Sequence, residues 1–486
     1  MNILFSHSYF LRFDPKQWQL GQPYPPLGTL YAAALMREKG FSVSLFDTMF
    51  AHSPQELLPA LEKNHPSYFV LYDDGFNYLT KMCLTNMREA AFDMIALAKK
   101  KCCTVIVCSS DATDHHETYL DAGADFVILG EGEKTLSCLV EALQRGEEEF
   151  FSMEGIAFKK DGALVRTTAR SVMRDLDSLP LPAWDLVDIR PYKSRWMKEA
   201  GYFSINIGTT RGCPYKCNWC AKPIYGNRYN ARSPQNVVRE LVYLKEIFAF
   251  DHVWFCDDIF GLKPGWVQEF ADLVEKQGLH FRFKIQSRAD LLMQENYVSA
   301  LARAGAESVW MGAESGSQKI LDAMDKGITV QQIRGATHLL KKHGIRPCFF
   351  IQFGYLGESG EDIRKTIDMI SELRPSEIGI SVSYPLPGTG FYEKVKEQLQ
   401  HKSNWTDSDE LALMFHNTYQ AKFYKQLHRY VHSRYRKQQA FDHLKKILAS
   451  PLSGNWKIFK KAISGFLLVP LVFISKIRLK QLEKIS

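Results

Sequence analysis

Residues 203–220 read Phe203-Ser-Ile-Asn-Ile-Gly-Thr-Thr-Arg-Gly-Cys213-Pro-Tyr-Lys-Cys217-Asn-Trp-Cys220. The apolar run at the start and the glycine-containing turn after it predict a strand followed by a short loop that carries three cysteines. Thiolates are soft ligands that suit iron–sulfur clusters, and four of them normally hold a [4Fe–4S] cluster. Three closely spaced cysteines without an evident fourth therefore predict a cluster with one iron open to another ligand. A structural zinc site is the alternative, but it needs a fourth Cys or His nearby, and the next histidine is His252.

The C-x3-C-x2-C spacing, the preceding Arg211-Gly212 and the aromatic Trp219 resemble the signature of the radical S-adenosylmethionine superfamily. The resemblance implies that the three cysteines hold a [4Fe–4S] cluster, and that the amino and carboxylate groups of S-adenosylmethionine chelate its fourth iron. One electron then cleaves the sulfonium and releases a 5′-deoxyadenosyl radical. No catalytic residue beyond the cluster ligands Cys213, Cys217 and Cys220 is expected.

The bulk composition indicates a globular protein of two to three domains. The chain has 486 residues, of which 45% are hydrophobic and 24% are charged. Met1-Asn-Ile-Leu-Phe5 begins like a core strand and lacks the basic segment of a secretory signal. Most of the ten cysteines lie singly in apolar runs, as in proteins of a reducing compartment. We therefore expect a cytoplasmic protein, which its C-terminal region could attach to the surface of a membrane.

The net charge of +7 is unevenly distributed along the chain. Residues 420–486 contain fifteen Lys or Arg against two acidic residues, a net +13, so the preceding residues carry −6. The basic character therefore belongs to the C-terminal region. We expect no nucleic-acid partner for the rest of the protein.

The first 150 residues alternate short apolar runs with helical patterns, which predicts a parallel α/β sheet. Strands are expected at Asn2–Ser6, Ser42–Phe46, Ser67–Tyr72, Thr104–Cys108 and Asp125–Leu129. Helices are expected at Leu27–Lys39, Pro54–Asn64, Asn86–Lys100, His115–Ala122 and Lys134–Arg145. Five strands and five helices predict a flavodoxin-like doubly wound domain over residues 1–150. Ligands of such sheets bind beyond the carboxyl ends of the strands.

Residues 151–195 are expected to form a hairpin at Gly155–Thr168 and a proline-containing linker at Leu176–Asp188. From residue 196 to 400 the alternation resumes, with strands expected at Phe203–Gly208, His252–Cys256, Phe281–Gln286, Glu307–Met311, Pro347–Phe353 and Glu377–Ser383. Helical patterns separate them, for example Pro234–Phe248, Gly265–Gln277 and Glu361–Leu373. Six units are two fewer than a full barrel. They fit the partial (β/α)6 TIM-type barrel of the radical superfamily, with the cysteine loop after its first strand.

Polar residues follow several of these strands and are candidates for binding S-adenosylmethionine. Such a ligand needs carboxylate and carbonyl acceptors for its amino group, an apolar face for adenine, and a polar partner for ribose. In the resembling superfamily the segment after the second strand meets the methionyl amino group, although its common form there is Gly-Gly-Glu. The candidate set is Trp219, Asp257, Asp258, Arg288, Glu314 and Gln352. The same residue types also cap helices, and residue by residue both interpretations stay open.

The amino-terminal segments Pro25-Pro-Leu-Gly28-Thr-Leu-Tyr31 and Gly123-Ala-Asp-Phe-Val-Ile-Leu-Gly130-Glu-Gly132-Glu resemble those of cobalamin-binding radical S-adenosylmethionine enzymes. The resemblance implies a cobalamin site at the strand ends, where a glycine-rich turn lets the ligand approach the backbone. The candidate residues are Tyr72, Asp73, Ser109, Ser110, Gly130, Glu131 and Gly132. The chain lacks the Asp-x-His-x-x-Gly element through which some cobalamin proteins ligate cobalt. A domain that has lost cobalamin is the competing interpretation.

Residues 401–486 are expected to form a basic helical C-terminal region. Its apolar run, Ala462–Ser475, is bordered by lysines and arginines and contains Pro470. The run has fourteen residues, fewer than the ~20 that span a bilayer. This pattern favours peripheral docking at an anionic membrane surface. A helix that covers the barrel end or pairs with another subunit is the alternative.

The reaction implied by the resemblance is hydrogen abstraction from an unactivated carbon, followed by transfer of a methyl group from methylcobalamin. The protein would then be a methyltransferase acting at carbon or phosphorus on a small molecule, lipid-like or a tetrapyrrole, with flavodoxin or ferredoxin as reductant. A close alternative is a radical oxidative cyclase of the anaerobic magnesium-protoporphyrin ester type. An alternative of another class is a non-catalytic module that binds cobalamin or membranes and carries a vestigial cluster.

Overall fold

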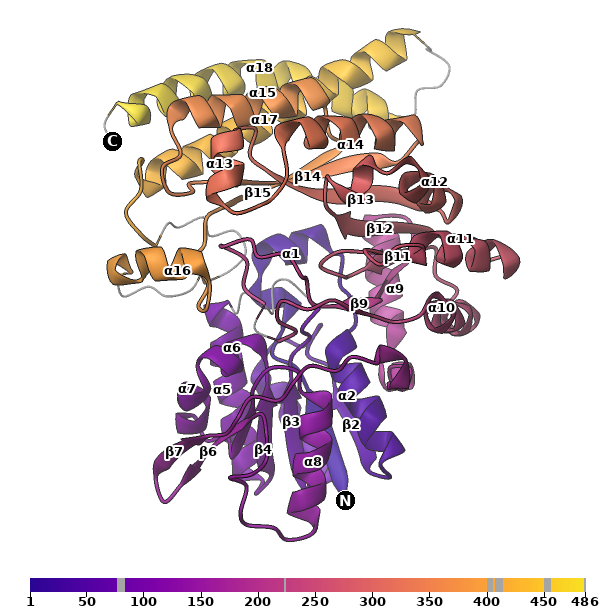
Figure 1. Ribbon diagram of the computed structural model, residues 1–486, viewed down its shortest axis with the longest axis vertical. Helices are drawn as coiled ribbons and strands as arrows, with labels where there is room; N and C mark the ends of the chain where they lie inside the picture. Colours follow the sequence, from indigo (N-terminus) through magenta and orange to yellow (C-terminus); the bar gives the residue numbers. More distant parts are fainter. Residues whose placement is uncertain (77–83, 223, 400–404, 407–413, 450–455, 485–486) are drawn as a thin grey trace.

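Two sheets organise the chain, one in its amino-terminal half and one in its carboxyl-terminal half (Figure 1). The computed structural model describes residues 1–76, 84–222, 224–399, 405–406, 414–449 and 456–484. The first sheet, here the N-terminal sheet, has the strand order β2-β1-β3-β4-β5-β6-β7. The second sheet has the order β15-β14-β13-β12-β11-β8. The chain is thus a mixed α/β protein with parallel sheets, as its alternating pattern predicted.

The N-terminal sheet begins with five parallel strands at the predicted places. They are β1 (Asn2–Ser6), β2 (Ser42–Phe46), β3 (Tyr68–Tyr72), β4 (Thr104–Cys108) and β5 (Phe126–Ile128). Strand β1 pairs with both β2 and β3, so the direction of strand addition reverses beside β1. Every residue of β3 is buried, as in a parallel sheet that is covered on both faces.

Helices cover both faces of the N-terminal sheet. They are α1 (Pro15–Leu20), α2 (Leu27–Glu38), α3 (Leu57–Asn64), α5 (Thr85–Lys100), α6 (Ser110–Asp114), α7 (His116–Asp121) and α8 (Glu133–Gln144). The apolar sides of α2 and α8 share one core with the sheet, and those of α3, α5 and α7 share another. The 3.6-residue periodicity of the sequence accounts for both cores, because it gives each helix one apolar face.

The predicted hairpin consists of β6 (Ile156–Lys160) and β7 (Ala163–Arg166). Antiparallel pairing of β5 with β6 adds this hairpin to the N-terminal sheet, which the sequence pattern did not predict. Phe126 of β5 lies opposite Phe158, and both rings contact Phe150. Aromatic packing between residues more than thirty positions apart therefore attaches the hairpin.

The connector to the second sheet contains two 3-10 turns, at Leu176–Ser178 and Trp184–Leu186, in the stretch expected to be a linker. Helix α9 (Ile189–Glu199) follows and was not predicted. Asp188 begins α9 by accepting a hydrogen bond from the Arg190 amide. Trp196 of α9 is buried and donates from Nε1 to the carbonyl of Pro23, 2.8 Å away. Packing of this face against the amino-terminal half stabilises the helix.

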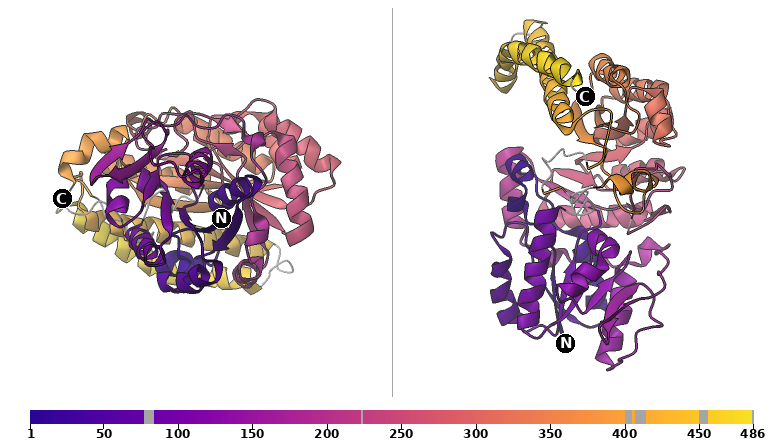
Figure 2. Two further views of the ribbon diagram at one scale, coloured as in Figure 1. Left: turned by 90° about the horizontal axis from the view of Figure 1, so that it is seen from below. Right: turned by 90° about the vertical axis from the view of Figure 1, so that its left-hand side faces the viewer.

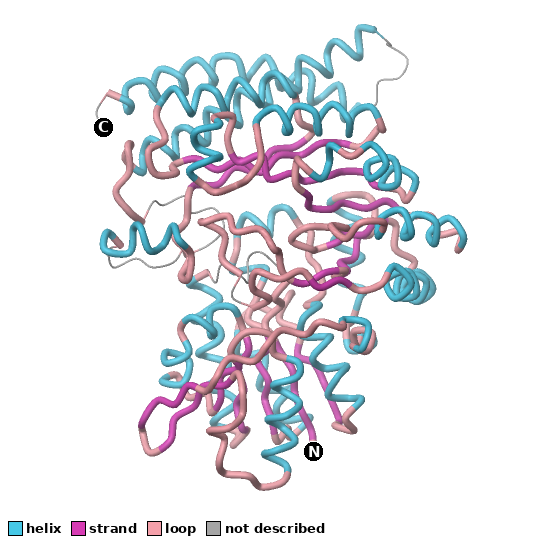
Figure 3. The backbone as a smooth tube through the Cα atoms, viewed as in Figure 1, coloured by secondary structure: helices cyan, strands magenta, loops and turns pink. Residues whose placement is uncertain are grey.

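The second sheet contains all six predicted strands, parallel and in sequence order. They are β8 (Ser204–Ile207), β11 (His252–Phe255), β12 (Arg282–Ser287), β13 (Ala306–Glu314), β14 (Arg346–Phe353) and β15 (Glu377–Val382). The accompanying helices are α10 (Pro234–Phe248), α11 (Trp266–Lys276), α12 (Glu295–Arg303), α13 (Gln318–Ala323), α14 (Val330–Lys342), α15 (Gly360–Leu373) and α16 (Gly390–Val395). Short strands β9 (Thr210–Arg211) and β10 (Asn230–Ala231) pair with each other beside this sheet. Figure 3 shows the strands of the second sheet crossing the upper half of the molecule.

Two long helices, α17 (Ala421–Ala449) and α18 (Trp456–Glu483), complete the chain. They lie side by side at the end of the molecule farthest from the N-terminal sheet (Figure 2). Helix α17 is attached to the second sheet's layer by Tyr435, whose hydroxyl donates to the Pro375 carbonyl at 3.1 Å. No helix within the described residues combines the length and the apolarity that a membrane crossing requires. Residues 401–404, 407–413 and 450–455 of the region expected to be helical lie outside the described residues.

Candidate cluster and cofactor site

The three cysteines follow β8 and β9, at the carboxyl end of the first strand of the second sheet. Gly212 precedes them with φ 78°, and a Cβ at this position would lie 2.2 Å from the Arg228 carbonyl oxygen. Glycine is therefore required where the loop begins. Burial raises the pKa of Cys213, and raises that of Cys220 to about 12. Thiols of this kind keep their protons until a metal displaces them.

The donor set of this loop fits an iron–sulfur cluster. Cys213 and Cys217 lie close enough to Cys220 for their charges to raise its pKa. In the part of the chain that the structure describes, no three Cys, His, Asp or Glu side chains converge on a single metal ion. A cubane does not require that, because its thiolates bind different irons. Three thiols on one loop suit such a cluster better than they suit tetrahedral zinc.

Asp257, at the end of β11, is bonded to the segment that leads into the cysteine loop. Its Oδ1 accepts hydrogen bonds from the amides of Thr209 at 2.7 Å and Thr210 at 2.8 Å. Its Oδ2 accepts from the Thr209 hydroxyl at 2.5 Å. Burial raises the pKa of Asp257 to about 6, although these hydrogen bonds oppose the shift. The carboxyl group predicted to contact S-adenosylmethionine therefore anchors the loop.

Asp258, the next residue, is half-buried and near the thiols. Its charge contributes to the raised pKa of both Cys213 and Cys220. The structure thus separates the two predicted acids, since Asp257 is bonded to the backbone and Asp258 lies by the cysteines. The sequence does not show which of these two consecutive acids is hydrogen-bonded to the backbone and which lies near the cysteines.

Arg288, after β12, packs directly on the cysteine loop. Its guanidinium carbon lies 3.6 Å from the ring centroid of Tyr215, which stands between Cys213 and Cys217. Its Nε pairs with Asp290 Oδ1 at 3.0 Å. Stacking of a guanidinium on an aromatic face is favourable. This predicted residue therefore belongs to the surroundings of the loop.

Glu314 ends β13 with φ 54°, a backbone conformation that is uncommon outside glycine. Its carboxylate accepts a hydrogen bond from Lys326 Nζ at 2.7 Å, and both side chains are buried. The same Nζ lies 5.7 Å from the ring centroid of Trp219. The structure thus brings the predicted Glu314 and Trp219 together through Lys326. Sequence reasoning missed this lysine, because a single lysine in a loop carries no local signal.

Several buried polar atoms near these strand ends lack hydrogen-bond partners among the described residues. Two belong to predicted residues, Trp219 Nε1 and Gln352 Oε1. Ser383 Oγ and Glu358 Oε1 follow β15 and β14, and were not among the candidates. Burial raises the pKa of Glu358 to about 8. An unsatisfied buried polar group costs about 1–3 kcal/mol, so several at one edge of a sheet indicate a place for a polar ligand.

The seven residues predicted to bind cobalamin share the carboxyl edge of the N-terminal sheet, since Tyr72 ends β3 and the other six follow β3, β4 and β5. Asp73 accepts hydrogen bonds from the amide and the hydroxyl of Ser8, at 2.6 and 2.8 Å. Ser109 caps α6 by accepting from the Ala112 amide at 2.9 Å. Tyr72 and Ser110 are buried at the same edge. The residues are therefore brought together, but internal hydrogen bonds already occupy the side chains of Asp73, Ser109 and Glu131.

The turn Gly130–Glu133 packs tightly on this edge. A Cβ at Gly132 would lie 2.4 Å from Cys108 Sγ and 2.8 Å from the Tyr72 ring, so only glycine fits. The Gly130 amide donates to Thr113 Oγ1 at 3.1 Å. Glu131 forms an ion pair with Arg211 of the cysteine segment, 2.6 Å between Oε1 and Nη1. Sequence reasoning assigned Glu131 to the ligand and missed its partner, which lies 80 positions away.

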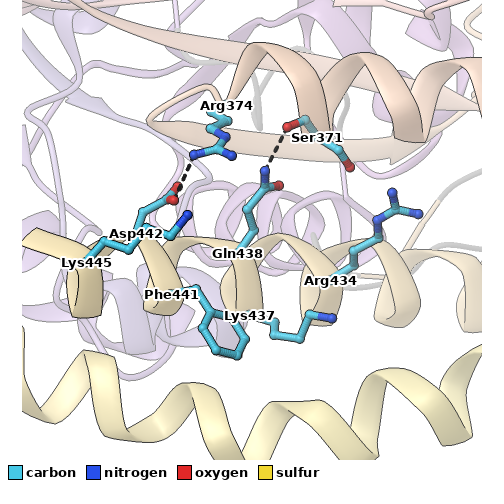
Figure 4. Close-up of a pocket in the computed structure, with 8 residues that line it drawn as sticks. All are labelled: Ser371, Arg374, Arg434, Lys437, Gln438, Phe441, Asp442 and Lys445. Carbon is cyan, nitrogen blue, oxygen red and sulfur yellow. Dashed lines mark hydrogen bonds and ion pairs between the residues drawn. The ribbon is translucent and has the colours of Figure 1, made fainter.

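A surface groove lies elsewhere, between the end of α15 and α17 (Figure 4). It is lined by Ser371, Arg374, Arg434, Lys437, Gln438, Phe441, Asp442 and Lys445. Arg374 forms an ion pair with Asp442 at 2.8 Å. Because α15 ends there and leads into the amino end of β15, the groove is at the opposite edge of the second sheet from the cysteine loop. It contains none of the predicted site residues.

The fold and the loop define a class: an α/β protein with a three-cysteine loop after the first strand of a six-stranded parallel sheet. The sequence profile described as the Radical SAM superfamily matches residues 207–370. That span runs from the end of β8 into α15 and contains the three cysteines. Residues 207–370 therefore form a radical S-adenosylmethionine domain, and the chain is an enzyme.

The relatives of the chain include enzymes of two named types. It is 26% identical over 395 residues to an uncharacterized methyltransferase of Pyrococcus horikoshii, covering 79% of this chain and 82% of that protein. It is 25% identical over 327 residues to the anaerobic magnesium-protoporphyrin IX monomethyl ester cyclase of Synechocystis sp., covering 66% of this chain and 63% of that protein. The chain thus spans slightly less than two thirds of the cyclase.

A solved structure shares the fold of most of the chain. The radical S-adenosylmethionine methyltransferase TsrM of Kitasatospora setae, solved with cobalamin and a [4Fe–4S] cluster bound, superimposes with a TM-score of 0.68. The match covers 82% of this chain and 75% of that protein, at 19% sequence identity. At this identity the likeness establishes the fold alone.

Proposed function

We propose that the chain is a cobalamin-dependent radical S-adenosylmethionine methyltransferase that acts on an unactivated carbon or on phosphorus. In this proposal residues 1–150 form a flavodoxin-like cobalamin domain, residues 151–195 a hairpin and linker, and residues 196–400 a partial (β/α)6 barrel. The observation that carries it is the junction of two carboxyl edges: Arg211, two residues before Cys213, pairs with the turn of the N-terminal sheet proposed for cobalamin. Two cofactor sites at adjoining edges are what methyl transfer to a substrate radical requires.

Cys213, Cys217 and Cys220 would hold the cluster. S-Adenosylmethionine would be bound by Trp219, Asp258, Arg288, Glu314 and Gln352. The unpartnered Nε1 of Trp219 and Oε1 of Gln352 are suited to a polar ligand. When bound, the cluster supplies the electron that cleaves S-adenosylmethionine, and cobalamin supplies the methyl group. The chain's own contribution is to orient these groups and exclude water. Asp257 contributes by fixing the segment before the loop.

The substrate proposed is a small molecule, lipid-like or a tetrapyrrole, and the reductant a flavodoxin or ferredoxin. The tetrapyrrole candidate is supported by the similarity to the magnesium-protoporphyrin cyclase. The same similarity favours oxidative cyclisation as the second candidate reaction. Detection of a methylated product in turnover mixtures would separate the two, because a cyclase leaves the methyl count of its substrate unchanged.

The test of the proposed function is anaerobic reconstitution with iron, sulfide and hydroxocobalamin, followed by absorption spectra and analysis of iron and cobalt. We expect about four irons and one cobalt per chain, as the composition of a cubane and one corrin dictates. A cluster without cobalt would refute methyl transfer from cobalamin and leave a radical enzyme of another kind. Zinc without a cluster would refute the proposal altogether.

Helix α18 supports a further part of the proposal, peripheral contact with an anionic membrane. Its exposed side chains include five large apolar residues, Val469, Leu471, Phe473, Ile474 and Ile477, which are 43–66% exposed. Three of them recur every four residues and so share one face of the helix. Exposed basic residues border this face at positions 476, 478 and 480. An apolar face with basic borders matches the surface of an anionic bilayer.

Flotation of the full chain with vesicles tests this contact. Vesicles of phosphatidylglycerol and phosphatidylcholine are expected to carry the protein, and vesicles of phosphatidylcholine alone to carry much less. Phe473→Asp with Ile477→Asp should abolish flotation, whereas Met197→Asp, at an exposed site on α9, should not. If the wild type does not bind vesicles but forms a dimer that the double variant disrupts, the apolar face is an interface with a second copy of the chain.

A further inference from the structure

Arg211 joins the two sheets immediately ahead of the cysteine loop. Its Nη1 pairs with Glu131 Oε1 at 2.6 Å, and its Nη2 pairs with Glu133 Oε1 at 2.7 Å. All three side chains are less than 10% exposed. Both acids belong to the turn after β5, so two carboxylates of the N-terminal sheet hold a residue that is two positions from Cys213.

Aromatic rings close the space around this ion pair. The Arg211 guanidinium carbon lies 5.5 Å from the ring centroid of Tyr31, 5.7 Å from that of Phe76 and 5.2 Å from that of Tyr225. Tyr31 and Phe76 come from the amino-terminal half, and Tyr225 follows the cysteine loop. A charge buried among rings must stay paired. Arg211 therefore has to follow any movement of the two carboxylates.

The acidic turn is itself tightly attached to the edge proposed for cobalamin. Gly132 leaves no space for a Cβ against Cys108 and Tyr72, so the turn cannot shift independently of the ends of β3 and β4. The carboxylate of Glu131 also accepts a hydrogen bond from the Met173 amide. Glu133 begins α8, and its Oε2 is buried without a partner among the described residues.

The segment before the cysteines is also held from the opposite side. Asp257 of the second sheet binds the amides of Thr209 and Thr210. Residues 209–211 are therefore fixed by one carboxylate from the second sheet and two from the N-terminal sheet. Their position sets where the cysteine loop begins, since Gly212 and Cys213 follow directly.

We propose that Glu131 and Glu133 are positioning residues for the cysteine loop, and that through Arg211 they couple the cluster to the ligand at the edge of the N-terminal sheet. The coupling rests on the proposed function, because it requires cobalamin at that edge. The positioning does not, because it follows from contacts present in the chain alone. Glu131 acts here through Arg211, in place of the ligand contact that the sequence suggested.

Hydrogen–deuterium exchange on the full chain without cofactors tests the positioning. Glu133→Gln and Arg211→Met should speed exchange in peptides that cover residues 209–222, and Arg211→Lys should have an intermediate effect because it keeps the charge without the planar fork. Asp47→Asn is the matched control, since Asp47 also bridges the two halves through the Tyr192 hydroxyl, 2.7 Å away, but not at the loop. Exchange of these peptides at the wild-type rate in Glu133→Gln would overturn the positioning. In Glu133→Gln, an acceleration of equal size along the whole chain would overturn it as well, because it would show a global loss of stability and no local effect at the loop.

Paramagnetic resonance of the reduced, reconstituted cluster tests the coupling. Hydroxocobalamin is reduced to paramagnetic cob(II)alamin under these conditions, so the g values of the cluster signal itself are compared. They should shift in the wild type and in Asp47→Asn, and stay unshifted in Glu133→Gln. An unshifted wild-type spectrum with bound cobalamin, detected by absorption, would overturn the coupling. Failure of the wild type to bind cobalamin would refute the proposed function and the coupling together, while the exchange experiment still decides the positioning.

Discussion

The carboxyl edges of the two sheets use their polar side chains in different ways. At the N-terminal sheet, Asp73 is bonded to Ser8 and Ser109 caps α6. At the second sheet, Trp219 Nε1 and Gln352 Oε1 are buried and have no partner in the described part of the chain. Among the residues predicted to bind a cofactor, Asp73 and Ser109 at the first edge are satisfied within the chain, whereas Trp219 and Gln352 at the second edge are not; at the first edge Glu133 Oε2 is also unsatisfied.

This difference bears on how each edge would bind a ligand. Unsatisfied polar atoms at the second sheet favour recognition by direct hydrogen bonds, since a ligand would relieve their desolvation cost. Satisfied side chains and a turn with no space for a Cβ at the N-terminal sheet favour recognition by shape and backbone. Substitutions should therefore impair cofactor binding mainly at the second sheet, and folding mainly at the N-terminal sheet.

The largest effect is expected from Cys217→Ala in the loop of the second sheet. Loss of one of three thiolates should abolish the [4Fe–4S] cluster and reduce cleavage of S-adenosylmethionine to background. Iron analysis and release of 5′-deoxyadenosine measure both. Cys138→Ala, in α8 of the N-terminal half, should retain wild-type iron and cleavage. A normal iron content in Cys217→Ala would contradict the assignment of this cysteine.

Arg211→Met should produce the largest loss of stability, because it breaks the junction between the two edges. It leaves the carboxylates of Glu131 and Glu133 buried without their cation, and breaking a buried pair in this way costs about 3–5 kcal/mol. Urea unfolding measures the loss. Arg190→Met removes an exposed pair with Asp188 and should leave the urea midpoint close to that of the wild type, because solvent screens such a pair. Equal losses in the two variants would show that the junction contributes no more than a surface pair.

The ion pairs of Arg211 with Glu131 and Glu133 could not be predicted from the sequence. The cysteine loop and the strands were predictable because spacing and periodicity are local, and β1, β2 and β4 have the predicted bounds. The pairing of Arg211 with Glu133 spans 78 positions, and that of Glu314 with Lys326 depends on a loop conformation. Helix α9 was missed because tertiary packing of Trp196 stabilises it. The cofactor residues remain predictions, because burial and partners decide between a ligand contact and an internal bond.

Glu358, in the loop that follows β14 of the second sheet, makes stability depend on pH. Burial raises its pKa to about 8 from the ordinary value of 4.5, so the folded chain keeps a proton that the unfolded chain releases. Its contribution to stability is fully present below pH 4.5. It falls by about 1.4 kcal/mol for each pH unit above that and is lost once the pH has risen through 8. Glu358→Gln should flatten the decline in Tm between pH 5 and 8. The same slope in variant and wild type would contradict a protonated Glu358.

Among these variants, Ser109→Ala should reduce stability least. Comparing its cofactor affinity with that of Gln352→Ala tests directly how the two edges bind their ligands. Its hydroxyl accepts a hydrogen bond from the Ala112 amide at 2.9 Å. Losing this bond should lower the free energy of unfolding by about 1 kcal/mol, as for other helix caps. If the N-terminal edge binds by shape, the affinity for hydroxocobalamin should change little, whereas Gln352→Ala at the second sheet should weaken S-adenosylmethionine binding clearly. Isothermal titration of both variants measures this. A large loss of cobalamin affinity in Ser109→Ala, with stability unchanged, would mean that the hydroxyl leaves its cap to bind the ligand, and that the two edges recognise their cofactors in the same way.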